Sequence, residues 1–146
     1  MDQKFLGEYE HAIDDKGRLT VPAKYRAGFK AGMVLTKGID RCLYLFPTDR
    51  WADLEEKASA LPLTNPTARE FQRHFFGGAV DLMADKQGRI ILHPRLREYA
   101  NIDNQAVVIG LSSYCEIWDP ESWREREARS DQDLEWRAEQ YAGLGI

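Results

Sequence analysis

The chain contains two cysteines, Cys42 and Cys115, and three histidines among its 146 residues. This is too little cysteine for a disulfide framework, and no Cys-x-x-Cys or His-x-x-x-His spacing is present for a zinc site. The longest apolar stretches, 106–111 and 43–46, are far shorter than the roughly 18 residues of a membrane span. Residues 1–5 lack an export signal. We expect a cytoplasmic protein with reduced, buried thiols and no metal or other cofactor.

Sequence signals of catalysis are also missing. No Gly-x-x-x-x-Gly-Lys phosphate loop and no Gly-x-Ser-x-Gly nucleophile turn occurs. Most carboxylates fall in two helical runs, 53–56 and 121–139, where charge usually marks a solvated face. These observations argue against an enzyme.

Acidic residues outnumber basic ones overall, but positive charge is locally concentrated. The net charge of −4 at first weighs against a nucleic-acid partner, because phosphate binding depends on lysine and arginine. Residues 119–139, with eight acidic residues against four arginines, account for that excess. The remainder is near neutral and holds two basic clusters, Lys16, Arg18, Lys24 and Arg26, and Lys86, Arg89, Arg95 and Arg97.

The chain contains an internal duplication. The segment 14–21 (DDKGRLTV) aligns with 85–92 (DKQGRIIL) at an offset of 71 residues, and each carries Asp-x-x-Gly-Arg. Further on, Cys42 aligns with Cys115 and Pro47 with Pro120, at an offset of 73. Several coincidences in one order indicate two copies of one module.

Each copy predicts the same series of elements. A strand runs into the Asp-x-x-Gly turn, an apolar strand returns from it, and a short helix follows at Pro22 or Pro94. Two more strands and a helix complete the copy. The strands are expected at 7–13, 19–21, 33–37 and 43–46, and at 79–84, 90–92, 106–110 and 115–118. The fold class is mainly β with short helices (α+β).

Four regions follow from this pattern. We expect a first repeat over 5–62, a connecting helix over 63–78 that packs Phe71, Phe75 and Phe76 into the core, a second repeat over 79–130, and a polar C-terminal tail over 131–146.

The repeated turn is the candidate functional site. Asp14, Gly17, Asp85 and Gly88 are explained by turn geometry, since Asp bonds the backbone and Gly takes positive φ. The arginine that follows is not required by a turn. It either pairs with the Asp of its own motif, or reaches a DNA groove to bind guanine while neighbouring lysines bind phosphates. The ion pair could also hold the arginine in place.

Taken in order, these motifs resemble those of the MraZ family of bacterial transcriptional regulators, built from two AbrB-like halves. The resemblance covers nearly the whole chain and includes 5–7 (FLG), both Asp-x-x-Gly-Arg motifs, 73–79 (RHFFGGA) and 97–99 (REY). His93 departs from the pattern, standing where the family has a proline that matches Pro22.

The resemblance implies a swapped-hairpin AbrB-like fold, with the halves packed as a pseudo-dimer in one chain. It further implies a ring-like homo-oligomer, associated with the nucleoid, that binds short direct repeats upstream of the division and cell-wall gene cluster, including its own promoter. Carried over to this chain, the double-stranded-DNA contacts fall on Lys16, Arg18, Lys86 and Arg89, with Lys24, Arg26, Arg95 and Arg97 as weaker candidates. Two alternatives remain: an AbrB-type antitoxin, and a ring-forming protein-interaction module that binds no DNA.

Overall fold

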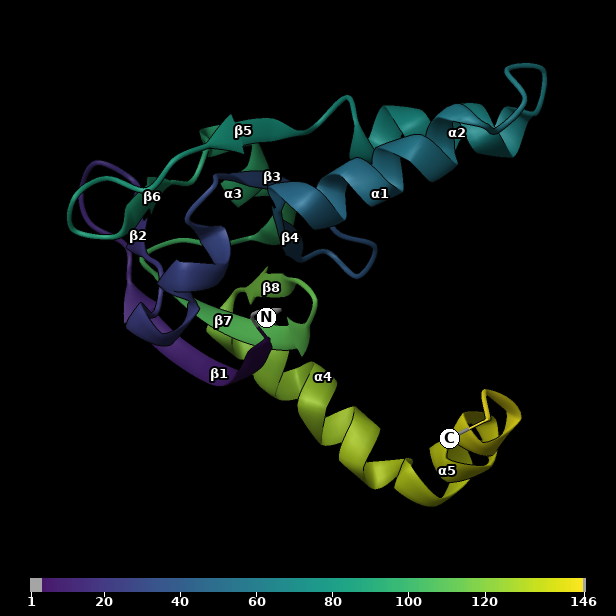
Figure 1. Ribbon diagram of the computed structural model, residues 1–146. Helices are drawn as coiled ribbons and strands as arrows, with labels where there is room; N and C mark the ends of the chain where they lie inside the picture. Colours follow the sequence, from purple (N-terminus) through teal and green to yellow (C-terminus); the bar gives the residue numbers. More distant parts are fainter. Residues whose placement is uncertain (1–3, 146) are drawn as a thin grey trace.

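The computed structural model describes residues 4–145, which form a six-stranded sheet, a separate two-stranded ribbon and surrounding helices (Figure 1). Met1–Gln3 and Ile146 lie outside the described part. The first three belong to the segment in which no export signal was found, and Ile146 belongs to the expected C-terminal tail. The first half contains β1 (Phe5–Ala12), β2 (Arg18–Thr20), the 3-10 helix η1 (Ala23–Phe29), β3 (Met33–Lys37), β4 (Leu43–Pro47) and α1 (Thr48–Ser59). After α2 (Pro66–Phe75), the second half contains β5 (Val80–Leu82), β6 (Arg89–Ile91), α3 (Pro94–Ala100), β7 (Gln105–Ser112), β8 (Cys115–Trp118), α4 (Pro120–Gln132) and α5 (Leu134–Gly143).

The six-stranded sheet exchanges strands between the two halves. Its order is β1-β7-β8-β4-β3-β5, and every neighbouring pair is antiparallel. The first strand of each half pairs with the third strand of the other half, so that Phe5 lies opposite Ser112 and Met33 opposite Leu82. Neither half could complete its own sheet, and the two form one pseudo-dimeric body.

The ribbon is formed by the two strands that leave the turns. β2 pairs with β6, with Arg18 opposite Ile91 and Thr20 opposite Arg89. The expectation that each strand folds back on the strand before its turn is therefore wrong, except at one bridge between Ile13 and Leu19. Pairing across the halves lets both ribbon strands bury their middle residues in one shared core.

The exchanged hairpins confirm the swapped AbrB-like α+β fold that the family resemblance implies. Helices hold 41% of the residues and strands 28%, so the helical share is larger than the expected short helices suggest. Cap residues followed by proline place the starts of α2 and α4 correctly. Asn65 accepts hydrogen bonds from the N–H groups of Thr67 and Ala68 (2.9 and 3.3 Å), and Asp119 accepts one from Ser122 N (3.0 Å).

The central core joins both halves around Tyr25. This side chain is almost fully buried, makes edge-to-face contacts with Phe5 and Tyr9, and donates its hydroxyl to the carbonyl oxygens of Leu6 and Gly7, both at 2.7 Å. Burial raises the pKa of Tyr25 to about 12, so the phenol remains a donor at neutral pH. The core thereby fixes η1 against β1.

The helices lie on two sides of the sheet (Figure 1). α1 and α2 cover the side of β3 and β4, and the buried Thr36 hydroxyl donates to the Phe75 carbonyl (2.5 Å) at the end of α2. α4 and α5 extend from the other side, away from the ribbon. Within the region predicted as a polar tail, α5 forms an exposed helix, and Leu134 and Trp136 add apolar surface to it. No helix within residues 4–145 is long and apolar enough to span a membrane.

Candidate nucleic-acid interface

The two Asp-x-x-Gly turns have nearly identical geometry. Asp14 Oδ1 accepts the backbone N–H groups of Lys16 (3.0 Å) and Arg18 (2.9 Å), and Gly17 N donates to the Asp14 carbonyl (3.0 Å). In the second turn the matching donors to Asp85 Oδ1 are the N–H groups of Gln87 and Arg89, both at 2.9 Å. Gly17 and Gly88 both adopt φ of +77°, which a side chain would make unfavourable.

Each arginine pairs with the aspartate of its own turn. Arg18 Nε lies 2.6 Å from Asp14 Oδ2, and Arg89 Nε lies 2.8 Å from Asp85 Oδ2. Ion pairs exposed to this extent, about a third, add little to the stability of the fold, because water screens them, but they fix the direction of the guanidinium. Among the described residues, these bonds use only Nε, so both terminal nitrogens of each arginine remain available for a ligand.

These hydrogen bonds also set the charge of the aspartates. Backbone donation from Arg18 chiefly, together with the Arg18 side chain and Lys16 N, holds the pKa of Asp14 below its ordinary value of 3.8. The same arrangement with Arg89 and Gln87 lowers the pKa of Asp85. Both carboxylates are ionised at neutral pH, and both arginines stay oriented.

The turns are locked to one another across the halves. Val21 N donates to the Gly88 carbonyl (2.8 Å), and Leu92 N donates to the Gly17 carbonyl (2.9 Å). Each strand that leaves one turn is thus anchored on the glycine of the other. The two turns form one rigid unit at the end of the molecule where β2 and β6 lie side by side (Figure 1).

The ribbon presents both arginines on one face. Leu19 and Ile90, opposite each other, are 1% and 2% exposed and point into the core. Because side chains alternate along a strand, Arg18, Thr20, Arg89 and Ile91 all lie on the outer face. Ile91 is 57% exposed there, and the arginine side chains are 27% and 28% exposed. The structure therefore brings together the two arginines that the sequence singled out, from positions 71 residues apart.

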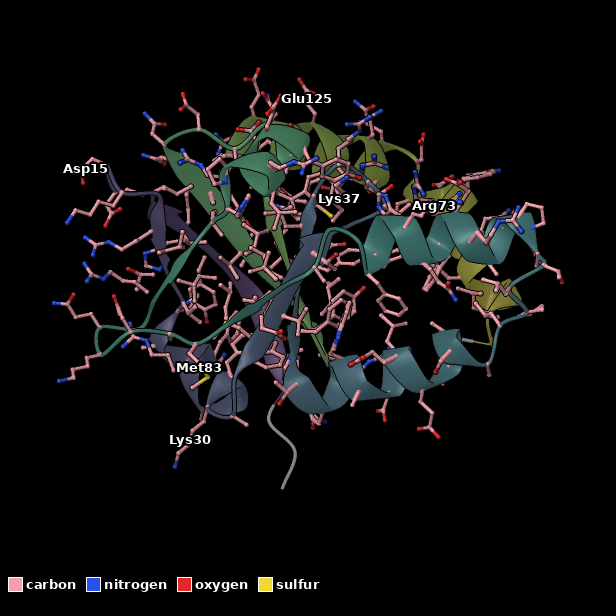
Figure 2. All side chains as sticks on the ribbon, turned by 90° about the horizontal axis from the view of Figure 1, so that it is seen from above. Asp15, Lys30, Lys37, Arg73, Met83 and Glu125 are labelled. Atoms are coloured by element: carbon pink, nitrogen blue, oxygen red, sulfur yellow. The ribbon has the colours of Figure 1, made fainter. Side chains whose placement is uncertain are left out.

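The lysine candidates lie at the tips of the turns, but not at equivalent positions. Lys16 corresponds to Gln87, and Lys86 corresponds to Asp15, which Figure 2 labels at the tip of the first turn. Both lysines are exposed. Each turn carries one lysine and one arginine, but Asp15 gives the first turn a second carboxylate, so the net charge of the second turn is more positive.

The weaker candidates divide into two kinds. Lys24 and Arg95 are exposed at the start of η1 and α3, whereas Arg26 and Arg97 contact the turn of the opposite half. A Cβ on Gly88 would overlap with Arg26 Nε, and a Cβ on Gly17 would lie 3.3 Å from Arg97 Nη1. Arg26 Nε also donates to the Val21 carbonyl (3.1 Å), and Arg97 Nη2 donates to the Asp103 carbonyl. These contacts were not predicted from the sequence. The only sign of them is that Arg26 follows Gly17 at the same distance along the chain as Arg97 follows Gly88.

The remaining candidates for a functional site within residues 4–145 are metal-binding clusters, the two thiols and His93. No group of three or more His, Cys, Asp or Glu side chains within 4–145 could hold a metal ion. Cys42 and Cys115 are buried and unpaired, and burial raises the pKa of both thiols, that of Cys115 to about 12. His93, the departure from the family pattern, occupies the cap position of α3 as Pro22 does for η1, and its Nδ1 accepts from Arg95 N (3.3 Å).

Comparison with known proteins gives the same family for both halves of the chain. The family described as "MraZ protein, putative antitoxin-like" matches the chain twice, over residues 4–74 and 75–143. A protein named Transcriptional regulator MraZ from Herpetosiphon aurantiacus is 56% identical over 120 residues, covering 82% of this chain and 84% of its own length. One of the same name from Desulfitobacterium hafniense strain Y51 is 48% identical over 142 residues, covering 97% and 99%.

Proposed function

Because the chain belongs to the MraZ family, whose relatives are named transcriptional regulators, we propose that it is a transcriptional regulator that binds specific double-stranded DNA through the β2–β6 ribbon. The observation that carries this proposal is the placement of Arg18 and Arg89 on one exposed face of the ribbon. The major groove admits a two-stranded ribbon, so both arginines can enter it together. The named relatives are regulators and not enzymes.

In this mode the arginines read bases and the lysines bind the backbone. With Nε held by Asp14 or Asp85, the terminal nitrogens of each arginine approach guanine O6 and N7 as a bidentate donor. Lys16 and Lys86 bind neighbouring phosphates, with Lys24 and Arg95 as further contacts. The acidic helices α4 and α5 point away from the ribbon, which reconciles a net negative chain with DNA binding (Figure 1).

The DNA target and the assembly extend the proposal. One ribbon offers two base-reading arginines, which is little for tight binding, but several protomers on several sites raise the effective concentration of each contact. We propose a ring-like homo-oligomer on short direct repeats in the promoter of the division and cell-wall gene cluster, its own promoter included. It would act in the cytoplasm on nucleoid DNA, without a cofactor.

Fluorescence anisotropy with direct-repeat promoter DNA and a scrambled duplex tests this function. Arg18→Ala and Arg89→Ala should each weaken binding to the repeats by about 5- to 150-fold, because each removes a bidentate base interaction of roughly 1–3 kcal/mol. Arg18→Lys should weaken it nearly as much, because lysine keeps the charge but cannot form the planar fork. Arg124→Ala, on α4, serves as the control for the change of charge. Equal affinity of the wild-type protein for repeat and scrambled DNA at physiological salt would exclude the proposal.

The antitoxin alternative is favoured by one observation, the antitoxin-like description of the matching family. An AbrB-type antitoxin would need a toxin partner, whereas a protein-interaction module would need no DNA. Purification of the tagged protein from its native cells tests both alternatives. A stoichiometric small protein partner supports the antitoxin, and a purified protein without sequence-specific DNA binding supports the interaction module. Sequence-specific DNA binding without such a partner supports the regulator.

A further inference from the structure

A basic groove lies beside the ribbon, between the end of α2, the β3–β4 turn and the start of α3. It has a volume of about 750 Å³. Its lining brings cationic side chains together from four separate segments, and Glu98 is the one carboxylate among the described residues that line it. The cations are Lys37, Arg41, Arg73 and Arg95. We call this the α2–α3 groove.

Most of this positive charge lacks a counterion. Within residues 4–145, no carboxylate forms an ion pair with Lys37, Arg41 or Arg95. Arg73 pairs with Glu70 on its own helix, where both side chains are well exposed. Lys37 Nζ and Arg41 Cζ lie 5.4 and 4.9 Å from the centroid of the Tyr99 ring. Like charges held together in this way favour the binding of an anion between them.

The walls of the groove are held by hydrogen bonds at its base. The Gly38 carbonyl accepts the Tyr99 hydroxyl (2.5 Å) and lies 3.1 Å from His74 Nε2. The bond from Thr36 to the Phe75 carbonyl ties the end of α2 to β3. Figure 2 shows Lys37 and Arg73 on the same side of the molecule, where α2 meets the sheet. The cations are therefore presented by a rigid frame, which lowers the entropy cost of binding.

The groove continues the outer face of the ribbon. Exposed and buried side chains still alternate past the end of β6: Ile91 is exposed, Leu92 is buried, and His93 is exposed and lines the groove. Leu92 N is also bonded to the Gly17 carbonyl, so this connection is fixed to the first turn. A double helix whose bases contact Arg89 would therefore bring its phosphate backbone to the groove.

The equivalent position in the other half is not basic. Ala27 and Gly28, which stand 71 residues before Glu98 and Tyr99, line a pocket of about 430 Å³. That pocket balances two cations with two carboxylates: Lys4 and Arg50, Asp49 and Asp53. The ribbon is nearly symmetric, but its two flanks differ in charge.

We propose that the α2–α3 groove binds backbone phosphates of DNA that flank the base pairs read by the ribbon, on one side only. This inference rests on the proposed function. A symmetric ribbon alone would bind a site in either direction. One basic flank gives each protomer a single orientation, which is what direct, rather than inverted, repeats require.

The salt dependence of binding tests this inference with the full chain. The groove variant carries Lys37→Gln, Arg41→Gln and Arg73→Gln, and the matched control carries Lys4→Gln, Lys57→Gln and Arg124→Gln, which remove equal charge elsewhere. Anisotropy titrations over a series of KCl concentrations give the slope of log affinity against log salt. The groove variant should make that slope shallower by about 0.9 for each phosphate that the protein no longer neutralises, and keep the preference for repeat over scrambled DNA. Circular dichroism establishes that each variant is folded, and Arg41→Gln alone should give the change expected of a single phosphate if the triple variant is not.

Three results would overturn it. Equal slopes for the groove and control variants show that the groove touches no phosphate, even though specific binding by the ribbon stands. Disappearance of the preference for repeats in the groove variant assigns base reading, not phosphate binding, to these side chains. Absence of any preference in the wild-type protein removes the proposed function, and the inference with it.

Discussion

At the residue scale, each turn is organised by one carboxylate. Asp14 and Asp85 accept two backbone N–H groups and one arginine Nε apiece. Asparagine could still accept the backbone bonds but not form the ion pair. The aspartates therefore connect the folding of the turn to the direction of the arginine.

The lowered pKa values of Asp14 and Asp85 predict a pH dependence of stability. A carboxyl group whose pKa is lower in the folded than in the unfolded chain stabilises the fold fully above its unfolded value, near 3.8, and loses this contribution as pH falls through its folded value. We expect the free energy of unfolding of wild type to fall more steeply, as the pH drops below the unfolded value near 3.8, than that of the Asp14→Asn, Asp85→Asn variant. Urea unfolding at several pH values measures this. Parallel pH curves for the two proteins would contradict it.

The turn glycines predict a difference between the halves. Gly17→Ala and Gly88→Ala should each cost about 1–2 kcal/mol, because both positions have positive φ. Gly88→Ala should cost about 0.5–1.5 kcal/mol more, since its Cβ displaces Arg26 from the Val21 carbonyl. Urea unfolding of both variants measures the difference. In an Arg26→Ala background the extra destabilisation should disappear; equal destabilisation at Gly17 and Gly88 in the native background would refute this role for Arg26.

At the scale of elements, the ribbon is both part of the core and the proposed DNA-binding surface. Its strands have three residues each, and the middle residue of each is buried while its neighbours face outward. Such short strands are stable only because Leu19 and Ile90 pack beneath them. The position of the arginines therefore depends on the core.

Adjacent isoleucines in β6 test that dependence. Ile90→Ala should destabilise the protein by about 2–5 kcal/mol through a cavity in the core. Ile91→Ala, on the exposed face, should change stability by less than about 0.5 kcal/mol. Thermal or urea unfolding distinguishes the two variants. Similar destabilisation by both would mean that the outer face of the ribbon is also packed.

Element positions could be predicted from sequence, and strand partners could not. Pro22, Asn65 and Asp119 are local signals, and the helices begin where these signals place them. The pairing of β2 with β6 depends on burial shared by residues far apart in sequence, so reasoning from neighbouring residues favoured a local hairpin. Only the family resemblance predicted the exchange.

The same division holds for the candidate site. Arg18 and Arg89 stood out because a turn does not require them twice. Lys37, Arg41 and Arg73 come from a strand, a turn and a helix, and no spacing in the sequence brings them together. The supporting contacts of Arg26 and Arg97 likewise depend on the opposite half.

At the scale of the whole molecule, the two thiols report on global unfolding. Cys42 and Cys115 are fully buried, with the pKa of each raised by burial, so little thiolate exists at neutral pH. We expect both to react with a disulfide reagent only as fast as the chain unfolds, and fully in urea. The absorbance of the released thiolate follows the reaction. Rapid labelling of either thiol in the native protein would instead indicate local opening of its strand.

The exchange of strands has a consequence for synthesis on the ribosome. β2 gains its partner only after Ile91 has emerged, and β1 gains its partner only after Ser112. Pairing over such separations is slow, because a long segment of chain must be ordered before contacts form. A prematurely ended translation product that stops before β6 therefore carries Arg18 but lacks Arg89 and cannot form the ribbon. Translation itself thus withholds the proposed DNA-binding surface until most of the polypeptide has been made.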